Sequence, residues 1–186
     1  MKAWRHFITI TRHKILVMKG CFAVGLYKQG LLHDLSKYMP SEFCIGARYY
    51  QGNRSPNTAE REAIGYSSAW LHHKGRNKHH FEYWIDYCGR GVNENMIPTK
   101  MPDKYIVEMF IDRLAASKVY NGRKYKDSDA YHYYLGGNIS RFLHPYTKAL
   151  LEKLLYINAK RGEQYAYRYI RRVVLKNERT KRGHKK

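Results

Sequence analysis

Apolar residues recur at steps of three and four along most of the chain, and no long run alternates between polar and apolar β-branched residues. The first spacing gathers apolar side chains on one face of a helix, whereas strict alternation would be typical of a half-buried strand. We therefore predict an all-α fold, a compact single-domain bundle of about seven to eight helices over residues 1–177. The strongly basic residues 178–186 predict a flexible tail.

Capping residues, glycines and prolines suggest where each helix begins and ends. We expect helices over 6–27, 30–38, 41–51, from Asn57 or Thr58 to about His73, and over 79–87, 103–120, 128–135, 145–160 and 163–177. In the helix after Asn57, the side chains of Ala63, Tyr66 and Trp70 should face the core. The stretch GRGVNENMIPTKMP is expected to be a loop.

Composition changes this picture in one respect, which is charge. The 44% hydrophobic content is enough for a folded core, while 35 Lys and Arg against 15 Asp and Glu give a net charge of +20. Such a surface attracts polyanions, phosphates above all, although attraction alone is not recognition. Near the C-terminus a basic helix face lies opposite an apolar one, which predicts weak nucleic-acid binding. The basic face holds Arg168, Arg171, Arg172 and Lys176, and the apolar face Ala166, Ile170 and Val173.

Cysteines and the N-terminal segment bear on where the protein works. Cys21, Cys44 and Cys88 are an odd number without C-x-x-C spacing, so neither a disulfide framework nor a zinc ribbon is expected. Basic residues interrupt the apolar letters of the first 27 positions, which argues against a signal core or a membrane span. These observations favour a cytoplasmic protein with no membrane partner.

Two ionisable residues occupy helix faces that should be buried. His13 falls in a stripe with Ile10 and Val17, and a buried imidazole needs a hydrogen-bond partner or a metal, because an unsatisfied polar group costs about 1 to 3 kcal/mol. Asp112 similarly shares a face with Met109 and Ala116, so its carboxylate needs a cation. A surface histidine and a salt bridge to a distant arginine are the ordinary alternatives.

The remaining candidates form two short motifs. In HDLSK, His33 offers a nitrogen and Asp34 offers two oxygens that can bridge two ions, while Lys37 lies one turn further and can reach a phosphate. In LHHKGRNKHHFEYW, two histidine pairs flank a turn and can converge on one cavity. These pairs are His72 and His73, then His79 and His80. The candidates for holding substrate oxygens are Arg76 and Asn77 in the turn, Arg113 beside Asp112, and Lys37.

These residues together resemble the ordered H…HD…H…HH…D ligands of HD-domain phosphohydrolases. The resembling positions are His13, His33, Asp34, His73, His79, His80 and Asp112. HDLSK is similar to the H-D-x-G-K of the binuclear and trinuclear branch, with Ser36 in place of glycine. The segments GLLHDLSKYMPSEF, AWLHHKGRNKHHFEYW and MPDKYIVEMFIDRLAAS are similar to an uncharacterised family of small bacterial and bacteriophage proteins. The likeness spans residues 12–117.

The resemblance implies a metal-dependent phosphohydrolase that acts on a phosphomonoester or phosphodiester through a metal-activated water. Asp34 would bridge the ions, and Lys37 would steady the developing charge. Imidazole with carboxylate suits Mn, Fe, Co, Ni or Zn, and we expect two ions, with one as the fallback. The gap between His73 and His79 is shorter than in HD-type cyclic-dinucleotide phosphodiesterases, and their G-Y-P signature is absent, so their substrate does not carry over. A nucleotide-type substrate is favoured.

A different enzyme class has a similar order of residues. HHKGRN followed by histidines resembles the His, Asn and His order of HNH-type nucleases. Those enzymes need a strand pair and a helix around one metal, whereas the flanking periodicity here is helical. An HNH-like nuclease and a non-catalytic nucleic-acid-binding protein therefore remain the two alternatives.

Overall fold

The computed structural model of the chain describes residues 1–89 and 96–176, so the predicted tail at 178–186 lies outside them. Within these ranges the all-α prediction is confirmed, with nine α-helices and one small hairpin. The α-helices are α1 (Lys2–Ala23), α2 (Tyr27–Leu32), α3 (Pro40–Arg48), α4 (Pro56–Ile64), α5 (Ser68–Arg76), α6 (Asp103–Asn121), α7 (Asp129–Leu135), α8 (Pro145–Arg161) and α9 (Glu163–Tyr169). Short 3-10 helices span Leu35–Tyr38, Phe81–Trp84, Gly122–Lys124 and Ile139–Phe142.

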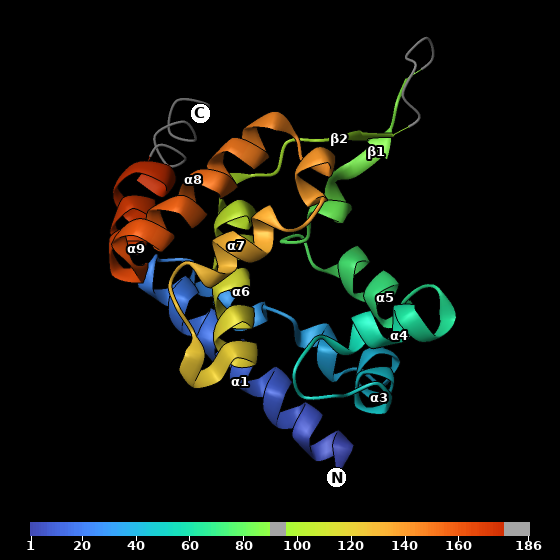
Figure 1. Cartoon of the computed structure of the whole chain (residues 1–186). Coiled ribbons are helices and arrows are strands. Elements are labelled where there is room, and N and C mark those ends of the chain that lie inside the picture. The colour runs from blue at the N-terminus through green and yellow to red at the C-terminus, as the bar shows by residue number, and fades with distance from the viewer. Residues whose placement is uncertain (90–95, 177–186) are drawn as a thin grey trace.

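Helix α6 is the centre of the molecule. Figure 1 shows α8 and α9 on one side of it and α3, α4 and α5 on the other, with α1 alongside. Ile106 and Phe110 on α6 pack in one buried apolar cluster with Val17 of α1 and Leu154 of α8. Because α1 crosses close by, a Cβ at Gly20 would lie 2.6 Å from Cγ2 of Ile111, so glycine is required there.

The helix predicted from Asn57 to His73 is two helices. Its N-cap is Ser55, with Pro56 in the first turn, and the chain breaks at Gly65, whose φ of +84° is left-handed. Ser67 then caps α5 by accepting a hydrogen bond from the Trp70 backbone N–H at 3.0 Å. The break turns the intervening segment outward, so Ala63 and Tyr66 are exposed, against the prediction.

The predicted helix over 79–87 is also wrong. After the 3-10 helix Phe81–Trp84 the chain enters strand β1 (Ile85–Tyr87), which pairs antiparallel with β2 (Met96–Pro98). Strand β2 lies in the predicted loop, of which residues 90–95 are outside the described ranges. Strands of three residues are too short to show the alternation by which a sequence reveals them.

The first and the last helix differ from the prediction in where they end and in which residues they bury. Helix α1 begins at Lys2 and ends at Ala23, because Gly25 adopts a left-handed φ of +82°. Helix α9 continues into a π-helix over Ile170–Val174. The wider π turn shifts the buried face by one residue, so Val174 and Leu175 are buried and Val173 is 39% exposed, not on the core side.

Membrane insertion can be judged from the described helices. None of the helices within residues 1–89 and 96–176 is both long and apolar enough to cross a bilayer.

Candidate metal centre

Four parts of the chain bring together all seven residues that the sequence nominated as metal ligands. Helix α1 carries His13, the turn after α2 carries His33 and Asp34, the segment from α5 onward carries His73, His79 and His80, and α6 carries Asp112. Their donor atoms fall into two groups within which all atoms lie no more than 4.8 Å apart. The first group is Asp34, His73, His79 and His80, and the second is His13, His33, Asp34 and Asp112.

Asp34 belongs to both groups and turns one oxygen to each. Its Oδ1 lies 3.2 Å from His73 Nε2 and 3.4 Å from His79 Nε2. Its Oδ2 lies 3.3 Å from His33 Nε2 and 3.7 Å from His13 Nε2. A carboxylate between two sets of imidazoles has the arrangement of a bridging ligand.

The backbone at Asp34 is the one non-glycine position with positive φ, +53°, in the described ranges. This left-handed residue ends the helix predicted over 30–38 and separates α2 from the 3-10 helix Leu35–Tyr38. Lys14 of α1 fixes the turn by donating to the carbonyl oxygens of Leu31 and His33, each at 2.8 Å. Strained backbone of this kind is frequent at functional sites, because the surrounding structure must hold it.

The imidazole nitrogens that face one another have no hydrogen bonds. Among the described residues, the buried Nε2 atoms of all five histidines and Oδ1 of Asp34 lack a hydrogen-bond partner. Asp112 Oδ1 is only 2.9 Å from His13 Nε2, but the ring is not aligned to donate to it. At about 1 to 3 kcal/mol each, six such atoms would cost as much as the roughly 5 to 15 kcal/mol by which a whole domain is stable.

The opposite nitrogens of three of these rings are held by two glutamates that sequence reasoning missed. Glu108 accepts hydrogen bonds from Nδ1 of His33 at 3.0 Å, and its Oε1 lies 3.2 Å from Nδ1 of His79. Glu42 accepts from Nδ1 of His73 at 2.8 Å. An ionised carboxylate can only accept, so Nδ1 carries a proton, and the neutral form of each ring keeps its lone pair on Nε2. Glu108 could have been found one turn before Asp112, at the i−4 position.

Carboxylates outnumber lysines and arginines at this centre. Asp34, Asp112, Glu42 and Glu108 contribute four negative charges, and Lys37 is the one Lys or Arg in the described ranges that forms an ion pair with any of them, at 2.5 Å from Asp34 Oδ2. Burial opposes ionisation of Asp34, but nearby His33 and Lys37 outweigh it and hold its pKa well below the usual range. The carboxylates therefore stay ionised, and either Lys37 with protonated His33 and His73 or bound metal ions must compensate their charge.

Two of the imidazoles are neutral and directly available as ligands, whereas Asp34 outweighs burial and raises the pKa of His33 and His73, so a metal would have to displace a proton from those two rings. Burial, with His79 and His73 close by, holds the pKa of His80 well below its usual value. Burial and the Lys37 charge also lower the pKa of His13, against the opposing pull of Asp112. Near neutral pH both rings carry a free nitrogen lone pair, which is the form that binds a metal.

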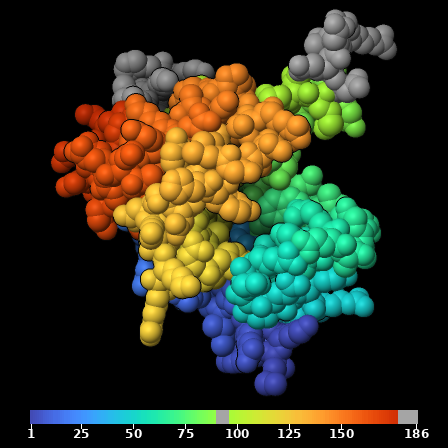
Figure 2. Space-filling view, viewed as in Figure 1, coloured from blue at the N-terminus to red at the C-terminus, as the bar shows by residue number. Residues whose placement is uncertain are grey.

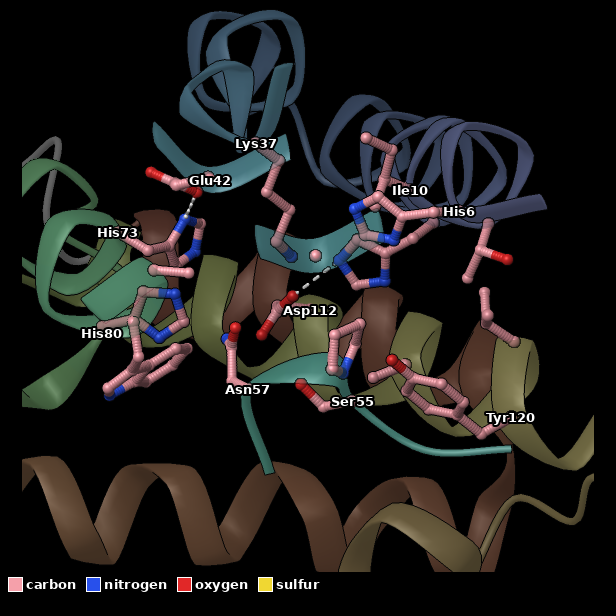
Figure 3. A pocket seen from close by; sticks show the side chains of 18 residues that line it. His6, Ile10, Lys37, Glu42, Ser55, Asn57, His73, His80, Asp112 and Tyr120 are labelled. Atoms are coloured by element: carbon pink, nitrogen blue, oxygen red, sulfur yellow. Dashed lines mark hydrogen bonds and ion pairs between the residues drawn. The ribbon is translucent and has the colours of Figure 1, made fainter. Parts of the chain in front are cut away.

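A pocket of about 180 Å³ opens onto this centre. Figure 3 shows Lys37, His73, His80 and Asp112 around it, and Ser55, Asn57 and Tyr120 also line it. In Figure 2 the surface is hollowed between the yellow segment that contains α6 and the cyan segment before α5. Donor groups at the bottom of an accessible pocket leave room for a ligand to reach them.

Of the four residues predicted to hold substrate oxygens, one lines the pocket and three lie elsewhere. Lys37 lines the pocket, whereas Arg76, Asn77 and Arg113 do not. Arg76 is exposed and donates to the carbonyl of His72 at 3.4 Å. Asn77 donates to Ser36 Oγ at 3.0 Å and so connects the turn to the HDLSK motif. Arg113 lies over the ring of Tyr134, and burial lowers its pKa.

His72 differs from its neighbour His73. Its Nδ1 donates to Glu42 at 2.6 Å, its Nε2 lies 3.2 Å from Ser41 Oγ, and it belongs to neither donor group. It contributes to the hydrogen bonds around the centre instead of facing it.

The fold and the site define the class of this protein as an all-helical protein with a buried cluster of histidines and carboxylates. The chain belongs to a family of unknown function (DUF5662), whose model matches residues 2–157 and so includes the whole cluster. No curated protein and no solved structure matches the chain. Membership agrees with the expected uncharacterised family, and the family description names no activity.

Proposed function

We propose that the protein is a metal-dependent phosphohydrolase with two divalent transition-metal ions. The observation that carries the proposal is the set of five buried Nε2 atoms and one Asp34 oxygen without hydrogen-bond partners. In three of the five rings, those of His33, His73 and His79, Nδ1 faces a glutamate and Nε2 points toward the other donors, which fits the ligand shell of a metal. The ordered resemblance to HD-domain phosphohydrolases supports the same conclusion.

The two donor groups would hold one ion each and share Asp34. Imidazole and carboxylate donors favour Mn, Fe, Co, Ni or Zn over Mg or Ca, which prefer all-oxygen shells. A third compact group consists of Glu108 and the Nδ1 atoms of His33 and His79 that face it. We assign no ion to this group, because these atoms already contact one another. When bound, the ions would supply an activated water as nucleophile and neutralise phosphate oxygens.

The chain's own residues do the rest. Lys37 stays protonated because Asp34 and Asp112 raise its pKa against the opposing effect of burial. Its ammonium group lines the pocket beside Asp34, where it can stabilise negative charge that develops on a phosphate. Glu42 and Glu108 orient the imidazoles. The basic chain favours phosphate esters, and we infer a nucleotide-type phosphomonoester or phosphodiester as substrate.

Metal analysis followed by a substrate screen tests this proposal. The purified chain should contain about two equivalents of transition metal and should hydrolyse p-nitrophenyl phosphate, bis-p-nitrophenyl phosphate or a nucleotide. Protein prepared with a chelator and reloaded with Mn, Co or Zn provides the matched comparison. A metal-free protein whose stability does not change on reloading would contradict the proposal.

The exposed basic face formed by α9 and the π-helix Ile170–Val174, called the basic face of α9 below, favours a second, compatible role in weak nucleic-acid binding. Arg168, Arg171 and Arg172 are exposed, while Ala166 and Ile170 on the other side are buried. Such a face can contact phosphates without reading a sequence. Titration of RNA and DNA at two ionic strengths would measure it.

A further inference from the structure

The pocket is far less basic than the protein that contains it. The chain carries a net charge of +20, yet Lys37 is the one Lys or Arg among the described residues that line the pocket. Its charge is paired with Asp34. Two arginines in the segments that form the rim already have partners. Arg54 forms two hydrogen bonds to Glu62, and the guanidinium of Arg61 lies 5.5 Å from the centre of the Trp70 ring.

The outer wall of the pocket is neutral. It is formed by apolar side chains such as Ile10 and Val119, together with the polar groups of His6, Asn57 and Tyr120. Burial, with a smaller effect of the Lys37 charge, lowers the pKa of His6 to about 4, so this ring is uncharged near pH 7. A second phosphate group at this wall would find no cation, and an uncompensated phosphate is costly to remove from water.

His6 is held in place at this wall. A Cβ at Gly46 would lie 2.3 Å from His6 Nε2, so only glycine lets the ring pack this closely on α3. The ring also lies against Phe43 and Tyr50, at centroid distances of 5.4 and 5.8 Å. The residue is 6% exposed, and its Nδ1 has no hydrogen-bond partner in the described ranges. A fixed, buried and unpaired nitrogen at a pocket wall indicates a missing ligand group.

The volume of the pocket and the distance between His6 and His13 limit the size of that ligand. His6 precedes His13 by two helical turns, which places it about 10 Å from the proposed metal ligand along α1. The pocket volume of about 180 Å³ is below the roughly 300 to 1,000 Å³ of pockets that enclose drug-sized molecules. A phosphate at the centre and a group about the size of a pentose would reach from one end to the other.

We propose that the site accepts a phosphomonoester with a single phosphate, whose leaving group is a small uncharged alcohol that hydrogen-bonds to His6. This inference rests on the proposed phosphohydrolase function and narrows it. Nucleoside di- and triphosphates and nucleic-acid ends are poor substrates on this proposal, in spite of the basic surface.

Steady-state kinetics on the metal-loaded full chain, at a buffered free metal concentration, tests the substrate class. We expect kcat/KM for a pentose 5-phosphate to exceed that for the matching pentose bisphosphate and for nucleoside di- and triphosphates by at least about tenfold. Equal or faster hydrolysis of the multiply charged esters would overturn the inference and leave the phosphohydrolase intact. If metal-loaded protein hydrolyses no ester at all, both proposals fall.

The role of His6 has its own test. His6→Phe keeps the ring and removes both nitrogens, so KM for the monoester should rise about 3- to 10-fold with little change in kcat. His6→Gln should recover part of this loss, and Gly46→Ala, which displaces the ring, should reproduce it. His132→Phe on the exposed face of α7 is the matched control. An unchanged KM in His6→Phe, or loss of bound metal from it, would contradict a role in leaving-group recognition.

Discussion

The two sides of α6 bury different kinds of residue. Toward α8 and α9 the helix packs on leucines and isoleucine. Two buried polar residues there bond to the backbone of other segments: Thr147 Oγ1 accepts from the Met101 N–H, and Asn158 Nδ2 donates to the Asp127 carbonyl, while Asn158 Oδ1 has no partner among the described residues. Toward α1, α3 and α5 the interior instead holds a run of ionisable side chains. These are His6, His13, His33, Asp34, Glu42, His73, His79 and Glu108.

The two sides therefore contribute differently to stability. The apolar side lowers the free energy of the folded state, and the polar side raises it. Apolar burial on the α8 side contributes favourably at about 25 cal/mol per Å². On the other side, the carboxylates and the five imidazole Nε2 atoms that lack hydrogen-bond partners within residues 1–89 and 96–176 cost free energy unless their charges and lone pairs are compensated. Substitutions on the two sides should therefore have different consequences, and five measurements can test this.

The largest effect is expected from the residue shared by both donor groups. Asn tolerates the left-handed backbone of residue 34, so Asp34→Asn removes the charge with little change of shape. We expect loss of bound metal and a fall in hydrolysis of more than about 100-fold. Asp86→Asn on the exposed strand β1 is the control. Two equivalents of metal in Asp34→Asn would show that the carboxylate is not a ligand.

The opposite outcome is expected on the apolar side. Leu154 is fully buried in the cluster with α6, and Leu154→Ala should lower the free energy of unfolding by about 2 to 5 kcal/mol. Denaturant titration measures the loss, and metal analysis of the folded variant should still give the full content. Selective loss of metal by this variant would mean that the two sides are not separable.

Removal of metal should destabilise the unaltered chain. A ligand present at 100 to 1,000 times its dissociation constant stabilises the native state by about 2.7 to 4.1 kcal/mol. For a chain of this length that corresponds to a fall in Tm of roughly 5 to 15 °C on chelation. Calorimetry before and after treatment with a chelator, and again after reloading, provides the comparison. An unchanged Tm after chelation would indicate that these histidine nitrogens do not bind metal.

The sequence indicated which residues cluster in the fold better than it indicated the elements that carry them. Helical spacing predicted that His13 is buried, because α1 is amphipathic, whereas α6 is buried on most sides and Asp112 on it is only half-buried. His33 and Asp34 were predicted as a pair, but the left-handed turn that aims them was not, since no local pattern around an aspartate requires positive φ.

The missed residues share a physical reason. Glu42 and Glu108 belong to the cluster only through the histidines they contact, 31 and 75 positions away in the chain. His6 is identified by its packing against Gly46, which is also a tertiary contact. The short strands Ile85–Tyr87 and Met96–Pro98 stabilise each other by pairing and have no periodicity of their own. Spacing along one element cannot reveal such contacts between elements.

The glutamates that orient the histidines should have an intermediate effect. Glu108→Gln keeps the shape of the side chain but removes the charge that holds Nδ1 of His33 and faces Nδ1 of His79. Metal affinity should fall about 10- to 100-fold, as measured by competition with a chelating dye. Glu60→Gln is the matched control, because Glu60 is equally buried but accepts hydrogen bonds from Ser67 and Ser68, away from the donor groups. Equal metal affinity in the two variants would count against the orienting role.

The smallest effect on folding is expected at the basic face of α9. Its charged side chains are exposed, in contrast to the buried carboxylates of the centre. Arg168 and Arg172 are exposed, so replacing both with glutamine should leave metal content and Tm unchanged. Arg171 is unsuitable because it donates to the carbonyl of Ala23 at 2.9 Å and so fastens α9 to the end of α1. If the face binds nucleic acid, the double variant should bind RNA and DNA more weakly, and the slope of log K against log salt should be reduced by about one for each lost phosphate contact. An unchanged slope would show that these two arginines do not contact phosphates. The buried centre on the other side of α6 would then be the remaining candidate site.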